Sequence, residues 1–199
     1  MTHPVRRLVV GISGASGIVY GIRVLELLHK AKVESHLVMT NSATLTLGYE
    51  SSLKLGDVER LADVVHSNSD MGANIASGSF KTLGMIIAPC SVKTMAAIAT
   101  GYTDSLIARA ADVALKQRRR LVLMVREAPL HLGHLRSMVA VTEAGAIVFP
   151  PVPAFYAKPK TLAEMIDHTV GRALDLFDID TGTVFQWDPS RGKERGSGK

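Results

Sequence analysis

The sequence of 199 residues has a single cysteine, few aromatic residues and no apolar run long enough to cross a membrane. One cysteine cannot form a disulfide within the chain, which agrees with a reducing compartment. A membrane-spanning helix needs about 18 or more consecutive apolar residues. The N-terminal residues lead directly into an expected strand without the apolar core of a signal peptide. We therefore expect a cytoplasmic protein that does not enter a membrane.

Nucleic-acid binding is disfavoured, although the formal net charge is +5. Aromatic side chains, on which bases stack, make up only 5% of the chain. Residues 189–199 hold four basic residues and one acidic residue, a net +3, which leaves +2 for the first 188 residues. Because Gly, Ser and charged side chains have little to bury, we expect 189–199 to be a disordered basic tail. Residues 1–188 are long enough for one domain with a single core.

The apolar pattern of residues 1–188 alternates between short buried-type runs and amphipathic helical segments. Runs without polar alternation are typical of parallel strands covered on both faces. Strands that alternate with helices predict an α/β fold, a doubly wound three-layer sandwich with a parallel, Rossmann-like sheet. One strand is expected from Arg7, and four others over 34–39, 84–88, 121–125 and 146–149.

Several local features are also predicted from turn and capping residues. Residues 53–64 are expected to form a short helix, and Pro89 is expected to end the third strand. Thr103 or Asp104 is expected to cap the helix that starts near Leu106. The small residues at 74–79 predict a loop that can approach a ligand closely.

The first expected strand leads into a turn with glycines at positions 11, 14 and 17. Glycine permits a sharp turn, and the free N–H groups of the next helix favour an anion, so the turn predicts a phosphate site. The spacing differs from the G-x-G-x-x-G of dinucleotide enzymes. Thr40 follows the second strand, where those enzymes place an acidic residue. A mononucleotide is therefore favoured over NAD.

Polar, small and basic residues follow the other expected strands as well. In an open parallel sheet, ligands bind beyond the carboxyl ends of the strands, so these residues are expected to share one cleft. Hydroxyls, helix starts and two cations together indicate a phosphorylated, partly apolar ligand, a description that FMN fits. The set is Gly14, Ala15, Ser16, Thr40, Ser91, Lys93, Thr94, Arg126 and Glu127.

Simpler structural roles stay open for some of these residues. Ser16 and Ser91 are each suited to cap a helix. Arg126 and Glu127 are able to form a structural ion pair. Lys93 is harder to explain in this way, because a cation in the first turn of a helix is unfavourable unless an anion lies beside it.

Other reactive side chains have weaker claims to a functional role. Cys90 follows a strand, but no base is assigned to it, so a core position is favoured over a nucleophile. His131 and His134 have the spacing of two metal ligands on one helix, but the sequence supplies no third or fourth ligand. We therefore expect no metal site.

Six stretches together resemble the UbiX-type flavin prenyltransferases, a family long described as aromatic-acid decarboxylases. The resemblance covers residues 6 to about 187 and implies a Rossmann-like flavoprotein. The matching stretches are Val10–Gly17, Ala76–Ser79, Pro89–Thr94, Arg109–Lys116, Arg126–Pro129 and Phe155–Tyr156.

The resemblance implies a metal-independent transfer of the dimethylallyl group from dimethylallyl phosphate to reduced FMN. The flavin N5 displaces phosphate, and a second bond to C6 closes a fourth ring. The product, prenylated FMN, serves a partner decarboxylase of the UbiD type. The family forms large homo-oligomers, typically dodecamers. A mean hydropathy of +0.19 agrees with apolar surface that an oligomer would cover.

The same resemblance implies roles for individual residues. Ser16 and Glu50 would relay protons during ring closure, and Glu127 would complete the polar wall near the allyl phosphate. The substrate phosphate would be held by Lys116, Tyr156 and Arg172. Trp187 would shield the carbocation-like carbon. The implied FMN ligands are Gly14, Ala15, Ser16, Thr40, Ser91, Val92, Lys93, Thr94 and Arg126.

Two other functions stay open from the sequence. One is an FMN-dependent decarboxylase of the cysteine-peptide type, which shares the fold; its Pro-x-Met-Asn signature is absent, and residues 151–156 occupy the corresponding region. The other is a non-catalytic flavin carrier subunit of an aromatic-acid decarboxylase.

Overall fold

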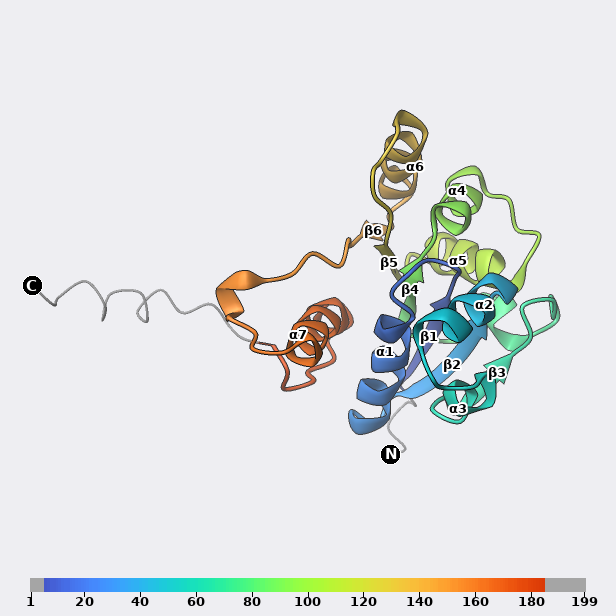
Figure 1. Cartoon of the computed structure of the whole chain (residues 1–199). Helices are drawn as coiled ribbons and strands as arrows, with labels where there is room; N and C mark the ends of the chain where they lie inside the picture. The colour runs from blue at the N-terminus through green and yellow to red at the C-terminus, as the bar shows by residue number, and fades with distance from the viewer. Residues whose placement is uncertain (1–5, 185–199) are drawn as a thin grey trace, which may run out of the picture.

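A parallel sheet of six strands, in the order β3-β2-β1-β4-β5-β6, organises the chain (Figure 1). The computed structural model describes residues 6–184. The strands are β1 (Arg7–Ile12), β2 (Glu34–Met39), β3 (Val64–His66), β4 (Gly84–Cys90), β5 (Arg120–Val125) and β6 (Ile147–Val148). The helices are α1 (Ile18–Lys30), α2 (Asn41–Glu50), α3 (Leu55–Glu59), α4 (Val92–Thr100), α5 (Leu106–Lys116), α6 (Leu132–Glu143) and α7 (Leu162–Asp175). Two 3-10 turns are η1 (Asn74–Ala76) and η2 (Phe155–Ala157).

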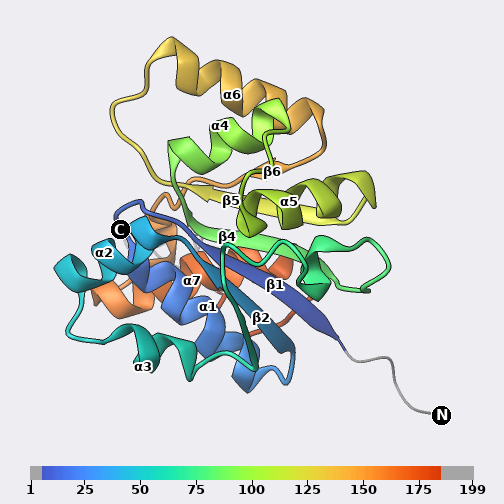
Figure 2. The same ribbon diagram turned by 90° about the vertical axis from the view of Figure 1, so that its right-hand side faces the viewer.

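Helices cover both faces of the sheet, which confirms the predicted doubly wound three-layer fold (Figure 2). Successive side chains of a strand point to opposite faces, so β1 contributes to two separate cores. Leu8 and Val10 pack in the cluster that includes α1 and α7. Val9 packs in the cluster that includes α4 and α5. The central strands are therefore buried on both sides, as their unbroken apolar runs predict.

The structure corrects two predictions of secondary structure. The helix expected over 53–64 is limited to α3, and Val64–His66 forms β3 at the edge of the sheet. A three-residue edge strand whose Val65 is 44% exposed has too short an apolar pattern to be recognised. Pro89 does not end β4, which continues to Cys90 through an irregularity in its pairing with β5. A proline is tolerated in a strand at such an irregularity.

The remaining predictions at this level concern the chain ends and the membrane. No helix within residues 6–184 is long and apolar enough to cross a membrane. The expected domain boundary at 188, the basic tail and Trp187 lie outside the described residues.

Candidate functional site

A cleft of about 520 Å³ lies at the carboxyl edge of the sheet, lined by segments that follow β1, β2, β4 and β5. This volume is within the range of pockets that bind cofactors. Glu127 and every residue predicted to bind FMN line the cleft, so the structure brings this set together, and their binding of FMN stays a prediction. These residues are Gly14, Ala15, Ser16, Thr40, Ser91, Val92, Lys93, Thr94, Arg126 and Glu127.

The turn after β1 is packed tightly against its neighbours. A Cβ atom added to Gly14 would lie 2.3 Å from the Cβ atom of Ser42, so no larger residue fits without displacing the backbone. The buried Ser13 joins this turn to the one after β4. Its Oγ donates to the carbonyl oxygen of Pro89 at 3.1 Å and accepts from the backbone N–H of Ser91 at 2.7 Å. The two turns therefore form one hydrogen-bonded unit.

Ser16 is held by a carboxylate and does not cap α1. The N-cap is Gly17, whose φ of 100° lies in the left-handed region that favours glycine. The Oε2 atom of Glu50 accepts from the backbone N–H of Gly17 at 2.8 Å and of Ile18 at 3.0 Å, and the Glu50 carboxylate also hydrogen-bonds the Ser16 side chain. The α1 N-terminus thus binds an anion that the chain itself supplies, the Glu50 carboxylate.

Burial raises the pKa of Glu50, but the hydrogen bonds from Ser16 and from the α1 backbone, with the charge of Arg126, together lower that pKa below its ordinary value. Glu50 is therefore ionised at neutral pH, with Ser16 hydrogen-bonded to it. Arg126 is also near Tyr20, whose pKa is raised by burial and lowered in part by the Arg126 charge. This positive charge faces the cleft.

Ser91, as predicted, and Thr40 cap their helices while lining the cleft. Ser91 Oγ accepts from the backbone N–H of Thr94 at 3.3 Å, and Thr40 Oγ1 accepts from that of Ala43 at 3.1 Å. Lys93 lies in the first turn of α4 and has no ion-pair partner within residues 6–184. A cation at the positive end of a helix dipole is unfavourable on its own, so this position favours a bound anion.

The ion pair considered between Arg126 and Glu127 is not formed in the described part of the chain. The backbone N–H of Arg126 donates to the carbonyl oxygen of Cys90 at 3.1 Å, which fixes the turn after β5 against β4. Within residues 6–184, Glu127 Oε1 accepts only from the N–H of Ala128, at 3.1 Å. Both charged side chains are therefore available to a ligand in the cleft.

Asn68 also lines the cleft and was not predicted. Its side chain accepts from the backbone N–H of Ile107 at 3.0 Å, and its carbonyl oxygen accepts from that of Leu106 at 2.8 Å. It therefore supplies the α5 cap that was expected from Thr103 or Asp104. No local signal identifies this role, because Asn68 is distant from α5 in the sequence and follows the unrecognised strand β3.

Tyr156 and Arg172 line a second cavity, of about 460 Å³, between the η2 segment and α7. In the described part of the chain, no residue lines both this cavity and the cleft. Lys116 lines neither. It ends α5, whose first turn borders the cleft, and a helix of 11 residues is about 16 Å long. Within the described residues of one copy, the cleft and the cavity of Tyr156 and Arg172 are therefore separate, and Lys116 borders neither.

The small-residue loop at 74–79 is also away from the cleft. It packs on α5, and the guanidinium of Arg119 donates to the carbonyl oxygens of Gly78 and Phe80, both at 2.7 Å. This loop therefore lies near the end of α5 that carries Lys116, because Arg119 follows that helix closely.

The remaining candidates have structural roles. Cys90 is fully buried, and burial raises its pKa to about 12, so its thiol is a core group and not a nucleophile. His131 Nδ1 accepts from the N–H of Gly133 at 3.0 Å and caps α6. Its ring stacks on that of His134, with 3.6 Å between the centroids. Residues 6–184 contain no group of three side chains placed to bind a metal.

Comparison with known proteins shows the family. The Flavoprotein family model matches residues 2–179. The flavin prenyltransferase UbiX of Thauera aromatica is 54% identical over 188 residues, which is 94% of this chain and 97% of that protein. The chain belongs to the UbiX flavin prenyltransferases. The resemblance inferred from the six sequence stretches is thereby confirmed, and the protein is an enzyme of the transferase class.

Two solved structures are similar to this chain over most of their length. AnUbiX (PadA1), determined in complex with FMN and dimethylallyl pyrophosphate, has a TM-score of 0.91 at 54% identity and covers 92% of this chain and 97% of its own. A dodecameric FMN-dependent UbiX-like decarboxylase from Escherichia coli O157:H7 has a TM-score of 0.89 at 44% identity, over 92% and 99% of the two chains.

Proposed function

We propose that this enzyme transfers a dimethylallyl group from dimethylallyl phosphate to N5 and C6 of reduced FMN. The observation that carries the proposal is the cleft at the carboxyl edge of the sheet, where a tight glycine turn and an unpaired Lys93 meet at helix starts. Family membership and a relative bound to FMN and dimethylallyl pyrophosphate support the same reaction.

The residues of the cleft fit FMN. Gly14 packs closely on Ser42, and both residues line the cleft. Lys93 and Arg126 supply positive charge for the ribityl phosphate, and the capped starts of α2 and α4 supply N–H groups. Reduced FMN supplies the nucleophilic nitrogen of the reaction. The protein supplies its position and excludes water.

Ser16 and Glu50 are the proposed proton relay. Closure of the new ring at C6 releases a proton, and an ionised carboxylate bound to a hydroxyl is suited to accept it. Glu50 keeps its charge because its pKa is lowered by hydrogen bonds that overcome the effect of burial. It also fixes the hydroxyl of Ser16 at the turn that lines the cleft.

Tyr156, Arg172 and Lys116 are proposed to hold the phosphate of the prenyl donor, with Lys116 acting on a neighbouring copy. Lys116 is at the far end of α5 from the cleft, so within one copy it is distant from the reaction. A homologue is dodecameric. In a homo-oligomer, Lys116 of one copy is able to approach Tyr156 and Arg172 of another. Fixed cations then stabilise the leaving phosphate without a metal ion.

Trp187 and Glu127 complete the proposed site. Glu127 lines the cleft beside Arg126 and gives it a polar wall. Trp187 lies outside the described residues, and its role as an aromatic shield for the reacting carbon stays a prediction. We further propose a UbiD-type decarboxylase as the recipient of prenylated FMN, and a cytoplasmic location, which the reduced, buried Cys90 supports.

The function is tested by anaerobic incubation of the purified protein with reduced FMN and dimethylallyl phosphate, followed by mass spectrometry of the released flavin. We expect a flavin heavier by one five-carbon unit, formed without any other protein. An unchanged flavin mass would contradict the proposal. Turnover by the protein alone would exclude a non-catalytic carrier.

A further inference from the structure

His168 on α7 is buried, and neither of its ring nitrogens has a hydrogen-bond partner within residues 6–184. It is only 5% exposed. The large majority of buried polar atoms in proteins are paired, because an unpaired buried donor or acceptor loses its hydration without compensation. A histidine with a purely structural role in a core would hydrogen-bond at least one nitrogen. We therefore expect the hydrogen-bond partner of His168 to be a group outside the described residues.

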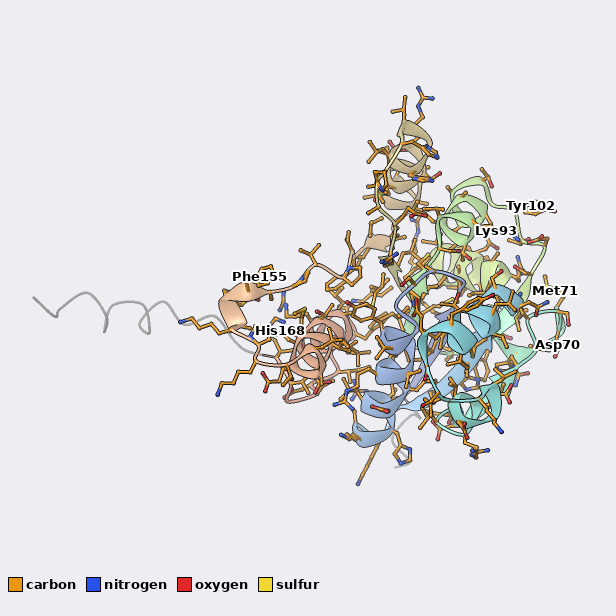
Figure 3. All side chains as sticks on the ribbon, viewed as in Figure 1. Asp70, Met71, Lys93, Tyr102, Phe155 and His168 are labelled. Carbon is orange, nitrogen blue, oxygen red and sulfur yellow. The ribbon has the colours of Figure 1, made fainter. Side chains whose placement is uncertain are left out.

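The position of His168 indicates what that partner is. It lines the cavity of about 460 Å³ that Tyr156 and Arg172 also line. It precedes Arg172 by four residues, so the two side chains are on the same face of α7. Its ring packs edge-on against that of Tyr156, with 5.7 Å between the centroids and 82° between the planes. Figure 3 shows His168 on α7, on the side facing the segment with Phe155.

The nearby carboxylates are already engaged and do not partner this histidine. Glu164 and Asp167 line, with His168, a smaller adjoining cavity. Asp167 is held by two nitrogens of Arg23, at 2.6 and 3.0 Å. Glu164 accepts from the backbone N–H of Lys160 at 2.6 Å. Among the described residues, Arg172 by contrast has only one weak polar contact, 3.5 Å to Asp175, and most of its guanidinium is available.

The other side of the cavity is apolar. Phe149, Val152, Pro153 and Phe155 contribute to its wall. The cavity thus combines an imidazole, a guanidinium and a phenol with a hydrocarbon surface. A small molecule with a phosphate at one end and a short apolar chain at the other matches both parts.

We propose that His168 is a further ligand of the prenyl donor, donating a ring N–H to a phosphate oxygen that Arg172 also binds. This inference rests on the proposed function, and it adds a residue to the phosphate site implied by the family resemblance. An imidazole carries one N–H when neutral and two when protonated, so the donor is present in either state. When the phosphate is bound, its oxygen accepts this hydrogen bond, so the ring nitrogen is no longer buried without a partner.

The test measures binding of dimethylallyl phosphate to protein loaded with oxidised FMN, so that no turnover consumes the ligand. Calorimetry compares wild type with His168→Phe, which keeps a ring but has no N–H, and His168→Gln, which restores an N–H donor. His134→Phe is the matched control, because His134 also has an unpaired nitrogen but lines neither cavity. FMN affinity is measured for every variant.

We expect His168→Phe to weaken donor binding about tenfold, the value of a hydrogen bond to a charged group. His168→Gln should recover most of the affinity, and His134→Phe and FMN binding should not change. Equal affinity of wild type and His168→Phe, or a His168→Gln variant as weak as His168→Phe, would overturn the inference. If His168→Phe does not fold, His168→Leu is compared with His168→Gln in its place. Failure of wild type to bind the donor would instead contradict the proposed function.

Discussion

The Ser16 side chain and the Glu50 carboxylate are hydrogen-bonded to each other at the start of α1, although they are 34 positions apart in the sequence. Glu50 is the last residue of α2 and reaches back to the turn that follows β1. Glu50 therefore connects Ser16, which lines the cleft, to the backbone N–H groups at the N-terminus of α1.

We predict that Glu50→Gln binds FMN but forms the ring-closed product about 100-fold more slowly, the usual contribution of a positioned acid–base group. Glutamine keeps the size and accepts the same N–H groups, but it cannot take a proton. Single-turnover kinetics with reduced FMN and dimethylallyl phosphate measure the rate. Unchanged product formation would remove Glu50 from the relay.

The same carboxylate predicts a dependence of stability on pH. The pKa of Glu50 is lower in the folded protein than its ordinary value of 4.5. Its contribution to stability is therefore complete above pH 4.5 and is lost as the pH falls through the folded pKa. Wild type should unfold at higher denaturant than Glu50→Gln at pH 7, and the difference should shrink below pH 4.5. A difference that persists at low pH would contradict this explanation.

Gly14→Ala should weaken FMN binding roughly tenfold, because overpacking costs about 1–3 kcal/mol and the new methyl group would overlap Ser42. Flavin fluorescence titration measures the effect. Gly48→Ala is the control, since a Cβ atom there meets nothing within 4 Å. That control should bind FMN normally and be slightly more stable, because alanine favours a helix.

Lys116→Ala and Arg172→Ala should each raise the KM for dimethylallyl phosphate about tenfold or more, because each removes a hydrogen bond to a charged group. If the two residues act from different copies, co-expression of the two variants should produce some sites with both residues intact. The mixed protein should then be more active than either variant alone. No recovery in verified mixed oligomers would show that Lys116 does not act on a neighbouring copy. Lys30→Ala, at the end of α1, is a control for loss of a surface cation.

Local sequence patterns were sufficient for the sheet and for most of the cleft. Unbroken apolar runs identified β1, β2, β4 and β5 because these strands are covered on both faces. The rule that ligands bind at the carboxyl ends of parallel strands then placed Thr40, Ser91 and Arg126 together. Both steps depend only on neighbours in the chain and on a general property of the fold.

The features that were missed depend on contacts between distant segments. β3 is short and half covered, so it leaves no clear periodic signal. Asn68 caps α5 from another loop, which no local pattern reveals. The distance of Lys116 from the cleft follows from the length and direction of α5, and not from its sequence neighbours, so the sequence does not reveal that Lys116 lies away from the cleft within one copy.

Ser13 lies in the turn after β1, and its hydroxyl donates to Pro89 and accepts from Ser91 at the end of β4, so neither turn can shift relative to the other without breaking a buried hydrogen bond. The turns after β1 and β4, which border the cleft, are thus joined before any flavin binds, so we expect little conformational entropy to be lost or regained when a flavin binds or leaves. A site that changes little between the empty and the occupied state suits a protein whose proposed product is itself a modified flavin, since that product must be released after each turnover.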